Sequence, residues 1–561
     1  MPRKDKKYEI VVRIAALLVA INALVIIIST LIDEKIIYHG FRPSNISISI
    51  NLLAGLFLLY FSRLLSRRKR VAWIVVIGIY LIFLLHNMSL IGRESFRYGL
   101  TPYIYLRDFL TPALIVVGLS LSRSLFIVKS DIKSFASSFR FILMILLITF
   151  GYGVLGFMIM DTRDFHHEIN FLNAAQNTID QFGLTGNSLV PYTARARLFL
   201  DSLSLISILA IVLSITSLFK PVKSRLIDQF KNRLIMHELL LNYPACSEDF
   251  FKIWPHDKDY FINTQQNAGL AYKSHNSHAL IVGDPAGEQR EFPELLKSFD
   301  ELCYVNDWSP VFVHVEDNHR LLYESMGYAM QKLGEEAIVD LNHFSTHVIN
   351  NKYFRNIKNK FNSANYTNEL LLAPHSPDIL NALHKISNEW LKSPGRTERG
   401  LIMGYYTTSY MQQCNILVAK NSEGTIMGFI NQVPSYDKKE ANYDLLRSSK
   451  QSLGNINDYL MLNFINECIN QGYQKVNLGL CPLSGLDGGP NEDNKLLDKL
   501  LSFTYTNGDK LYSFSGLRKF KNKYEPEWSP RYLCYRGGII NFTKSMNSLN
   551  KSWKVHFRNI H

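Results

Sequence analysis

The stretch HRLLYESMGYAMQKLGEEAIVDL, residues 319–341, decides how the second half of the chain is interpreted. Its first part, residues 319–326, mixes apolar and polar side chains at the spacing of a short helix. The dipeptide Gly327-Tyr328 then marks a turn. An apolar run follows and ends at Asp340, which predicts a strand. The stretch is therefore predicted to be a short helix that turns directly into a strand.

Strands and helices alternate on both sides of this stretch. Upstream, strand candidates 278–282 and 310–315 flank a helix candidate, 291–306. Downstream, the candidates are a helix at 377–391, strands at 415–419, 425–433 and 441–446, a helix at 458–471 and a strand at 475–479. Such alternation indicates an α/β region. Because the order of strands and helix repeats, we predict two similar lobes, residues 226–375 and 376–561.

The first 220 residues have a different character. They contain six apolar stretches of roughly the 20 residues that cross a bilayer: 8–32, 46–66, 71–91, 105–128, 139–160 and 198–219. This part has 23 Lys+Arg against 12 Asp+Glu, whereas residues 221–561 have 38 against 36. The cations gather before the first stretch, in alternate connections and after the sixth. We therefore predict an α-helical transmembrane bundle over residues 1–225, a multi-pass protein of the cell membrane with both termini in the cytosol, and an outside loop at 161–197.

The six cysteines argue against a metal or disulfide framework. All lie after residue 245, and none forms a Cys-x-x-Cys pair. We expect reduced thiols in a cytosolic region, no metal and no cofactor.

Several motifs of the second half occur together in one known order. They include GDPAGE (283–288), the run from Pro310 to Leu341, SNEWL (387–391), YDLLR (443–447) and GLRKFKNKYEPEWSPRYL (516–533). In this order they resemble the catalytic domain of the aminoacyl-phosphatidylglycerol synthase, or lysylphosphatidylglycerol synthetase, family. Residues 319–341 by themselves resemble the closing unit of the GNAT acyltransferase fold. The resemblance implies two tandem GNAT-like folds with an active site between them.

The resemblance also implies a reaction and its partners. A hydroxyl of a membrane lipid such as phosphatidylglycerol would attack the ester of an aminoacyl-tRNA, with lysyl as the expected group. The partners would be aminoacyl-tRNA as donor and an anionic phospholipid as acceptor, and a homo-oligomer is left open. Longer members carry a larger membrane region that also flips the product, so we expect no complete flippase here.

Two other functions stay open. An acyl-CoA-dependent N-acyltransferase has the same fold but holds pyrophosphate in an Arg/Gln-x-x-Gly-x-Gly/Ala turn. The nearest stretch, residues 396–400, does not fit that turn. A transporter or scaffold that only binds lipid or tRNA is the other alternative, and it would tolerate the loss of Asp444 and Arg447, whereas the enzyme would not.

The candidate catalytic residues are Asp444, Arg447 and Asp458. Transfer from an activated ester needs a base near the attacking hydroxyl, which Asp444 can supply. Asp444 and Arg447 are three residues apart and would share a face if the chain were helical there. Arg447 could hold a phosphate, although a structural ion pair of the two explains them equally well. Asp458 could instead be the N-cap of its helix.

The candidate substrate-binding residues are Glu335, Glu336, Asn477 and Gly479. The two glutamates could equally belong to a solvated strand edge. Asn477 is a polar residue in an otherwise apolar strand, and Gly479 ends that strand. They lie where GNAT-like sheets splay to admit substrate, although a turn would need the same residues.

Cations that could contact tRNA or lipid lie in two clusters. Residues 511–561 contain ten Lys+Arg and two glutamates, and the cations alternate with aromatic residues. This pattern suits phosphates with stacked bases, or an anionic membrane surface, although charge runs are often only solvated faces. The candidates are Arg355, Lys358, Arg518, Lys519, Lys521, Lys523 and Arg531.

Overall fold

The computed structural model describes most of the chain and divides it into two compact units. The described residues are 6–36, 45–98, 103–126, 128, 135–166, 169–182, 190–218, 229–275, 277–393, 396–482, 484 and 514–553. One unit contains residues 1–224 with 305–307, and the other contains 225–304 with 308–561.

Long helices occupy the six apolar stretches of the first unit. They are α1 (Lys6–Ile36), α2 (Asn45–Ser66), α3 (Arg70–Tyr98), α4 (Tyr103–Leu121), α5 (Phe135–Ile159) and α8 (Ala194–Leu218). Helix α1 packs on α2, α3 on α4, and α5 on α8. Among the described residues, one stretch, Ile10–Ile28, is long and apolar enough to cross a membrane. The helices α2 to α5 contain shorter apolar runs.

The expected loop 161–197 contains helices. A single turn, α6 (Thr162–Phe165), precedes α7 (Phe171–Phe182), and α7 packs on α5. The contact is close because Gly153 has no side chain: a Cβ there would lie 2.4 Å from the Thr178 side chain. The sequence did not indicate these helices, because a helix with many polar residues lacks the continuous apolar run that marks its neighbours. That residues 161–197 form an outside connection stays a prediction.

The second unit is built on one mixed sheet. Its strands are β1 (Asp259–Ile262), β2 (Ala268–His275), β3 (His278–Val282), β4 (Ala286–Gly287), β5 (Ser309–Val315), β6 (Ala329–Asp340), β7 (Thr367–Leu371), β8 (Asn415–Lys420), β9 (Ile426–Val433), β10 (Glu440–Ser448), β11 (Lys475–Pro482) and β12 (Glu527–Tyr535). Their order in the sheet is β1-β2-β3-β5-β12-β6-β11-β10-β9-β8-β7, with β4 beside β2. The predicted α/β region is confirmed.

The same arrangement occurs twice in this sheet. Strands β3 and β5 are parallel and joined by α10 (Phe292–Asn306), and β10 and β11 are parallel and joined by α16 (Ile456–Asn470). The other pairs are antiparallel. An antiparallel run that continues through one parallel pair is the GNAT-like order. We call strands β1–β6 with β12 the first lobe and β7–β11 the second lobe.

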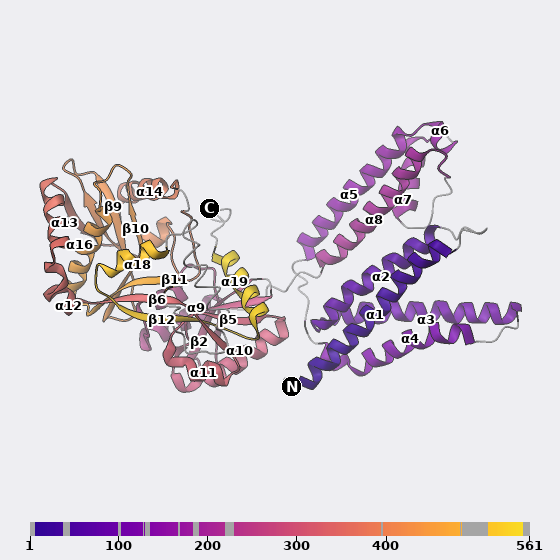
Figure 1. The fold of residues 1–561 in the computed structure, drawn as a ribbon, viewed down its shortest axis with the longest axis horizontal. Helices are drawn as coiled ribbons and strands as arrows, with labels where there is room; N and C mark the ends of the chain where they lie inside the picture. Colours follow the sequence, from indigo (N-terminus) through magenta and orange to yellow (C-terminus); the bar gives the residue numbers. More distant parts are fainter. Residues whose placement is uncertain are drawn as a thin grey trace. The chain divides into compact units, whose positions relative to one another are not determined.

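Two strands lie in a different lobe from the one that the sequence predicted. Strand β12, near the end of the chain, lies between β5 and β6 of the first lobe (Figure 1). Strand β7 pairs with β8 at the far edge of the second lobe. The expected boundary near residue 375 therefore falls inside the second lobe, because pairing partners far along the chain cannot be read from local patterns.

Helices cover the sheet and complete the cores. Helices α9 (Gln229–Asn242), α10, α11 (Arg320–Ser325) and α19 (Ile539–Trp553) pack on the first lobe. Helices α12 (Leu341–Thr346), α13 (Lys352–Ser363), α14 (Pro377–Leu391) and α16 pack on the second. Helix α14 starts where Ser376 accepts a hydrogen bond from the Ile379 amide and Pro377 occupies the first turn. The 3-10 turn η2 (Ser247–Lys252) reaches both lobes, because Phe250 packs in a core with residues of α14, β8 and β9, and Glu248 lies 3.0 Å from His314 of β5.

Candidate active site

Asp444 lies at an irregularity of strand β10. The pairing of β10 with β9 shifts between Tyr443 and Leu446. Asn431 stabilises this bulge, because its Oδ1 accepts hydrogen bonds from the amides of Asp444 (3.3 Å) and Leu445 (2.6 Å). A bulge of this kind redirects one side chain, here the Asp444 carboxylate.

The Asp444 carboxylate has the properties of a base that works near neutral pH. Its Oδ2 accepts a hydrogen bond from the Tyr410 hydroxyl at 2.9 Å. Burial raises the pKa of Asp444 to about 7, and the Tyr410 hydrogen bond and the Arg447 charge oppose that rise. A carboxyl group with such a pKa is ionised in part at neutral pH and can accept a proton there.

Arg447 has a partner other than Asp444. Its guanidinium donates to Glu398 through Nη1 (2.8 Å) and Nη2 (2.7 Å), and it lies 4.6 Å from the centre of the Trp390 ring. Arg447 is 2% exposed. Asp444 and Arg447 both lie on a strand, so the helical spacing argument was wrong. Because Glu398 occupies the guanidinium, Arg447 is not available to hold a ligand phosphate in this arrangement.

Asp458 lies in the first turn of α16 but does not cap it. The N-cap residue is Asn455, whose side chain makes no capping bond. Buried Asp458 instead pairs with Lys523 at 2.8 Å and accepts a hydrogen bond from the Tyr524 hydroxyl at 3.3 Å. These contacts join α16 to the residues that follow α18 (Phe514–Asn522). The structure favours a structural ion pair for Asp458.

Asn477 and Gly479 form a second bulge, in β11. The pairing of β11 with β6 shifts between Asn477 and Leu480. The Asn477 Oδ1 accepts from the Gly479 amide at 2.7 Å, and Gly479 has a φ of 82°. Lys521 donates to the carbonyls of Gly479 (2.7 Å) and Leu480 (3.0 Å). Strands β10 and β11 pair only as far as Asn442 and Asn477. Strand β11 continues to Pro482, so the prediction that it ends at Gly479 was wrong. The contact of Asn477 and Gly479 with substrate stays a prediction.

Glu335 and Glu336 lie on a central strand, so the alternative of a solvated edge was wrong. Strand β6 has β11 on one side and β12 on the other. Glu335 pairs with Arg518 (2.6 Å) and Lys332 (2.8 Å). Glu336 is fully buried and pairs with Arg531 at 2.6 Å.

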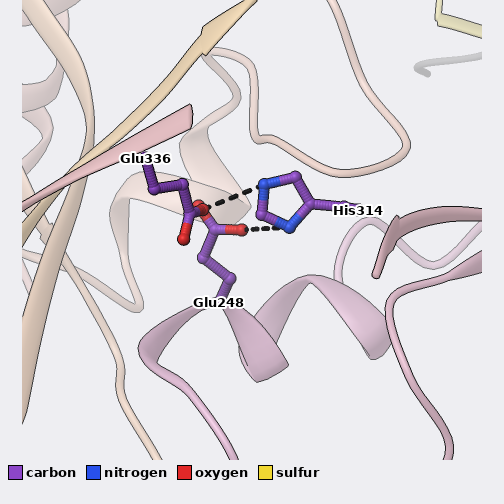
Figure 2. Close-up of side chains that lie close together, drawn as sticks. All are labelled: Glu248, His314 and Glu336. Carbon is purple, nitrogen blue, oxygen red and sulfur yellow. Dashed lines mark ion pairs between the residues drawn. The ribbon is translucent and has the colours of Figure 1, made fainter. Parts of the chain in front are cut away.

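Glu336 also belongs to a cluster with His314 and Glu248. The two carboxylates lie close together beside the His314 ring, with Nε2 2.9 Å from Glu336 and Nδ1 3.0 Å from Glu248 (Figure 2). Burial lowers the pKa of His314, but the charges of the two carboxylates and their hydrogen bonds to the ring have the larger combined effect and raise it to about 10. Burial, with the Glu336 charge, raises the pKa of Glu248 to about 7. His314 is therefore an imidazolium at neutral pH.

The same three residues have the spacing of a metal site. Their ligand atoms lie within 4.8 Å of one another. However, the carboxylates face opposite nitrogens of one ring (Figure 2). An imidazolium donates from both ring nitrogens and has no lone pair left to bind a metal ion. The arrangement therefore fits a protonated imidazole better than a bound metal.

A cavity of about 770 Å³ opens beside this cluster in the first lobe. It lies at the carboxyl ends of the parallel strands β3 and β5, where α/β sheets commonly bind ligands. The lining residues include Glu248, Asp284, His314, Glu316, Ile402 and Arg531. Asp444 and Arg447 do not line it, but Gly404, two residues after Ile402, abuts the Asp444 carboxylate.

Most of the predicted tRNA- or lipid-binding cations have internal partners. Arg518, Lys523 and Arg531 form ion pairs, and Lys521 is buried. The interleaved aromatic residues do not offer free faces either, because Tyr524 is buried and Trp528 lies under Arg518. The prediction of an exposed basic and aromatic surface at 518–531 was therefore largely wrong. The contact stays a prediction for exposed Lys519 and Arg355 and half-exposed Lys358.

Comparison with known proteins decides the family. The family model for the C-terminal part of phosphatidylglycerol lysyltransferase matches residues 238–535, more than half of the chain. This chain belongs to the phosphatidylglycerol lysyltransferase C-terminal family. The prediction made from the motifs is thereby confirmed.

Two relatives and one solved structure define the extent of the match. Phosphatidylglycerol lysyltransferase of Staphylococcus aureus (strain MRSA252) is 34% identical over 284 residues, which cover 51% of this chain and 33% of that protein. The Bacillus subtilis (strain 168) enzyme is 34% identical over 280 residues, 50% of this chain and 32% of that protein. The chain thus matches about a third of the length of these relatives.

The solved structure supports the fold of the second unit. It is the C-terminal domain of a putative lysylphosphatidylglycerol synthetase from Agrobacterium fabrum, with a TM-score of 0.51 at 23% identity. The match covers 59% of this chain and 100% of that domain.

Four residues of the site in this family member were not found from the sequence. His314 interrupts the apolar strand β5, which is the signal that identified Asn477 and could have identified it too. Glu248, Glu398 and Tyr410 lie in or beside short helical turns and connections without a pattern. Their roles depend on partners 34 or more residues away along the chain, as with Tyr410 and Asp444.

Proposed function

We propose that this member of the phosphatidylglycerol lysyltransferase family transfers an aminoacyl group, lysyl in the first instance, from aminoacyl-tRNA to a hydroxyl of phosphatidylglycerol. The observation that supports this most is Asp444, a partly buried carboxylate whose pKa is about 7 and which accepts a hydrogen bond from Tyr410. The named activity of the relatives in Staphylococcus and Bacillus agrees with it.

In this mechanism Asp444 acts as the general base. It accepts the proton of the lipid hydroxyl as that oxygen bonds to the ester carbon of the donor. The bond from that carbon to the tRNA ribose oxygen then breaks, and the proton returns to this oxygen. Because the donor ester is already activated, no covalent intermediate on the enzyme is required, and holding the two substrates together supplies much of the rate.

The first-lobe cavity is the proposed site for the ammonium groups of the donor's lysyl group, whereas the ester carbon would lie outside it, beside Asp444, which does not line the cavity. Glu248, Asp284 and Glu316 line it, and carboxylates favour the ammonium groups of a lysyl ester over a phosphate. Arg355, Lys358 and Lys519 are proposed to contact phosphates of the tRNA or of the membrane.

We further propose that the helices α1, α2, α3, α4, α5 and α8 cross the cell membrane, with both termini in the cytosol. Large apolar side chains project outward from them, such as Leu147, Ile148 and Leu155 of α5, each more than 60% exposed. Such surfaces suit lipid tails. Reporter fusions after residues 70, 130 and 225 should all be active in the cytosol and one at 185 outside; a cytosolic reporter at 185 would contradict this topology.

A reconstituted assay tests the transfer. The purified full chain is mixed with vesicles of phosphatidylglycerol and with lysyl-tRNA that carries a labelled lysyl group. Label should move to the lipid fraction and should cease to do so when ribonuclease is added first. Transfer that continues after ribonuclease treatment but requires acyl-CoA would favour the N-acyltransferase instead.

A further inference from the structure

Residues 396–404, which we call the connector, join α14 of the second lobe to α15 (Thr408–Met411) and contact both lobes. Its Leu401 and Ile402 pack in the first-lobe core with residues such as Leu280 and Val311. The Gly400 amide donates to the carbonyl of Trp553 in α19 at 2.9 Å. The middle of the connector is therefore anchored to the first lobe.

Glu398 anchors the same connector to the second lobe. Its two carboxylate oxygens accept the bidentate pair from Arg447 of β10, and the Tyr406 amide also donates to it at 3.3 Å. Both charged side chains are buried. Two parallel charge-assisted bonds fix orientation as well as distance, and removal of one partner would leave an uncompensated buried charge.

The end of the connector, at Gly404, is packed closely against Tyr410 and Asp444. A Cβ on Gly404 would lie 2.4 Å from the Tyr410 ring and 2.5 Å from the Asp444 Oδ2. Leu401 has a φ of 73°, a conformation that a leucine adopts only where its surroundings impose it. A small displacement of the connector would therefore reach Tyr410 and Asp444 directly.

We infer that Glu398 is a positioning residue for the transfer reaction: through Arg447 it holds the connector, so that Asp444 and Tyr410 keep their arrangement while Ile402 lines the first-lobe cavity. This inference rests on the proposed function. Glu398 itself is bonded to Arg447 and Tyr406 and acts through them. The charges agree with this role, because Arg447 lowers the pKa of Asp444 and Glu398 opposes that effect with a smaller one.

The test compares Glu398→Gln with Glu389→Gln in the full chain. Glu389 is the control, since it lies in the last turn of α14, shortly before the connector, and accepts a hydrogen bond from Ser449 instead of pairing with Arg447. Glu398→Gln should lower kcat for lysyl transfer by roughly ten- to hundredfold with little change in KM. It should also move the rising limb of kcat against pH to lower pH, because Asp444 keeps the influence of Arg447 but loses that of Glu398. The control should match the wild type.

Hydrogen exchange separates this inference from the proposed function. In Glu398→Gln the amides of residues 400–404 should exchange faster than in the wild type and in Glu389→Gln, whether or not transfer is detected. Unchanged exchange there would overturn the inference. So would a Glu398→Gln enzyme with a higher KM and an unchanged kcat, which would indicate substrate contact, or one with an unchanged pH profile. Absence of transfer by the wild type, with faster exchange in the variant, would overturn the proposed function alone.

Discussion

At the scale of single residues, the site depends on how one carboxylate is held. Asp444 is placed by a bulge in β10, shielded from water, and bonded to the Tyr410 hydroxyl. Burial and hydrogen bonding act in opposite directions on its pKa, which comes to about 7. An ordinary surface aspartate would be fully ionised at this pH but would be a much weaker base.

Replacing Tyr410 by Phe tests this balance. The ring would still pack between Phe250 and Trp254, but the hydrogen bond to Asp444 would be lost. Because that bond favours the charged form, its loss raises the pKa of Asp444 and the rising limb of the rate profile moves to higher pH. Below the pKa the rate should fall roughly tenfold. Initial rates between pH 5.5 and 8.5 measure this, and a limb that stays in place would contradict the assignment of Asp444 as base.

At the scale of elements, the bulge in β11 depends on a buried lysine. Lys521 of α18 donates to two carbonyls of the bulge, and burial lowers the pKa of Lys521 to about 8. An unfolded chain would bind this proton more tightly, with a pKa near the usual value of about 10.4. The contribution of Lys521 to stability therefore increases as pH rises from about 8 to about 10.5.

The matched variants Lys521→Met and Lys519→Met test this contribution. Lys519 is an exposed neighbour on the same helix and should change stability little. Lys521→Met removes the donor to both carbonyls and should destabilise the protein by about 1–3 kcal/mol at pH 7.5. The difference between wild type and this variant should grow at pH 10. Thermal unfolding of the full chain at pH 7.5 and at pH 10 provides the measurement. An equal loss of stability in Lys521→Met and Lys519→Met would rule out a stabilising role of Lys521 at the bulge.

Element positions were predictable where they depend on local patterns. Helix α14 coincides with the predicted 377–391, because a serine cap precedes that stretch and a proline and an apolar face lie within it. The polar helix α7 and the exchange of β12 into the first lobe were not predicted. A sequence shows that Arg447 is charged, but it does not show that its partner is Glu398, 49 residues away.

At the scale of the whole molecule, the second unit combines two GNAT-like lobes through shared strands. The connector and η2 cross between the lobes, so the Asp444 region and the first-lobe cavity belong to one folded unit. The order of the motifs was enough to predict the family. It did not predict that the cations expected to bind phosphate, such as Arg518 and Arg531, form internal ion pairs.

Mass spectrometry of membrane lipids tests the central claim most directly. Cells that express the wild type or Glu389→Gln should contain phosphatidylglycerol that carries an added aminoacyl group, lysyl in the first instance. Cells that express Asp444→Asn at equal protein level should lack it. An unchanged lipid profile with the wild type, or full product with Asp444→Asn, would contradict the account.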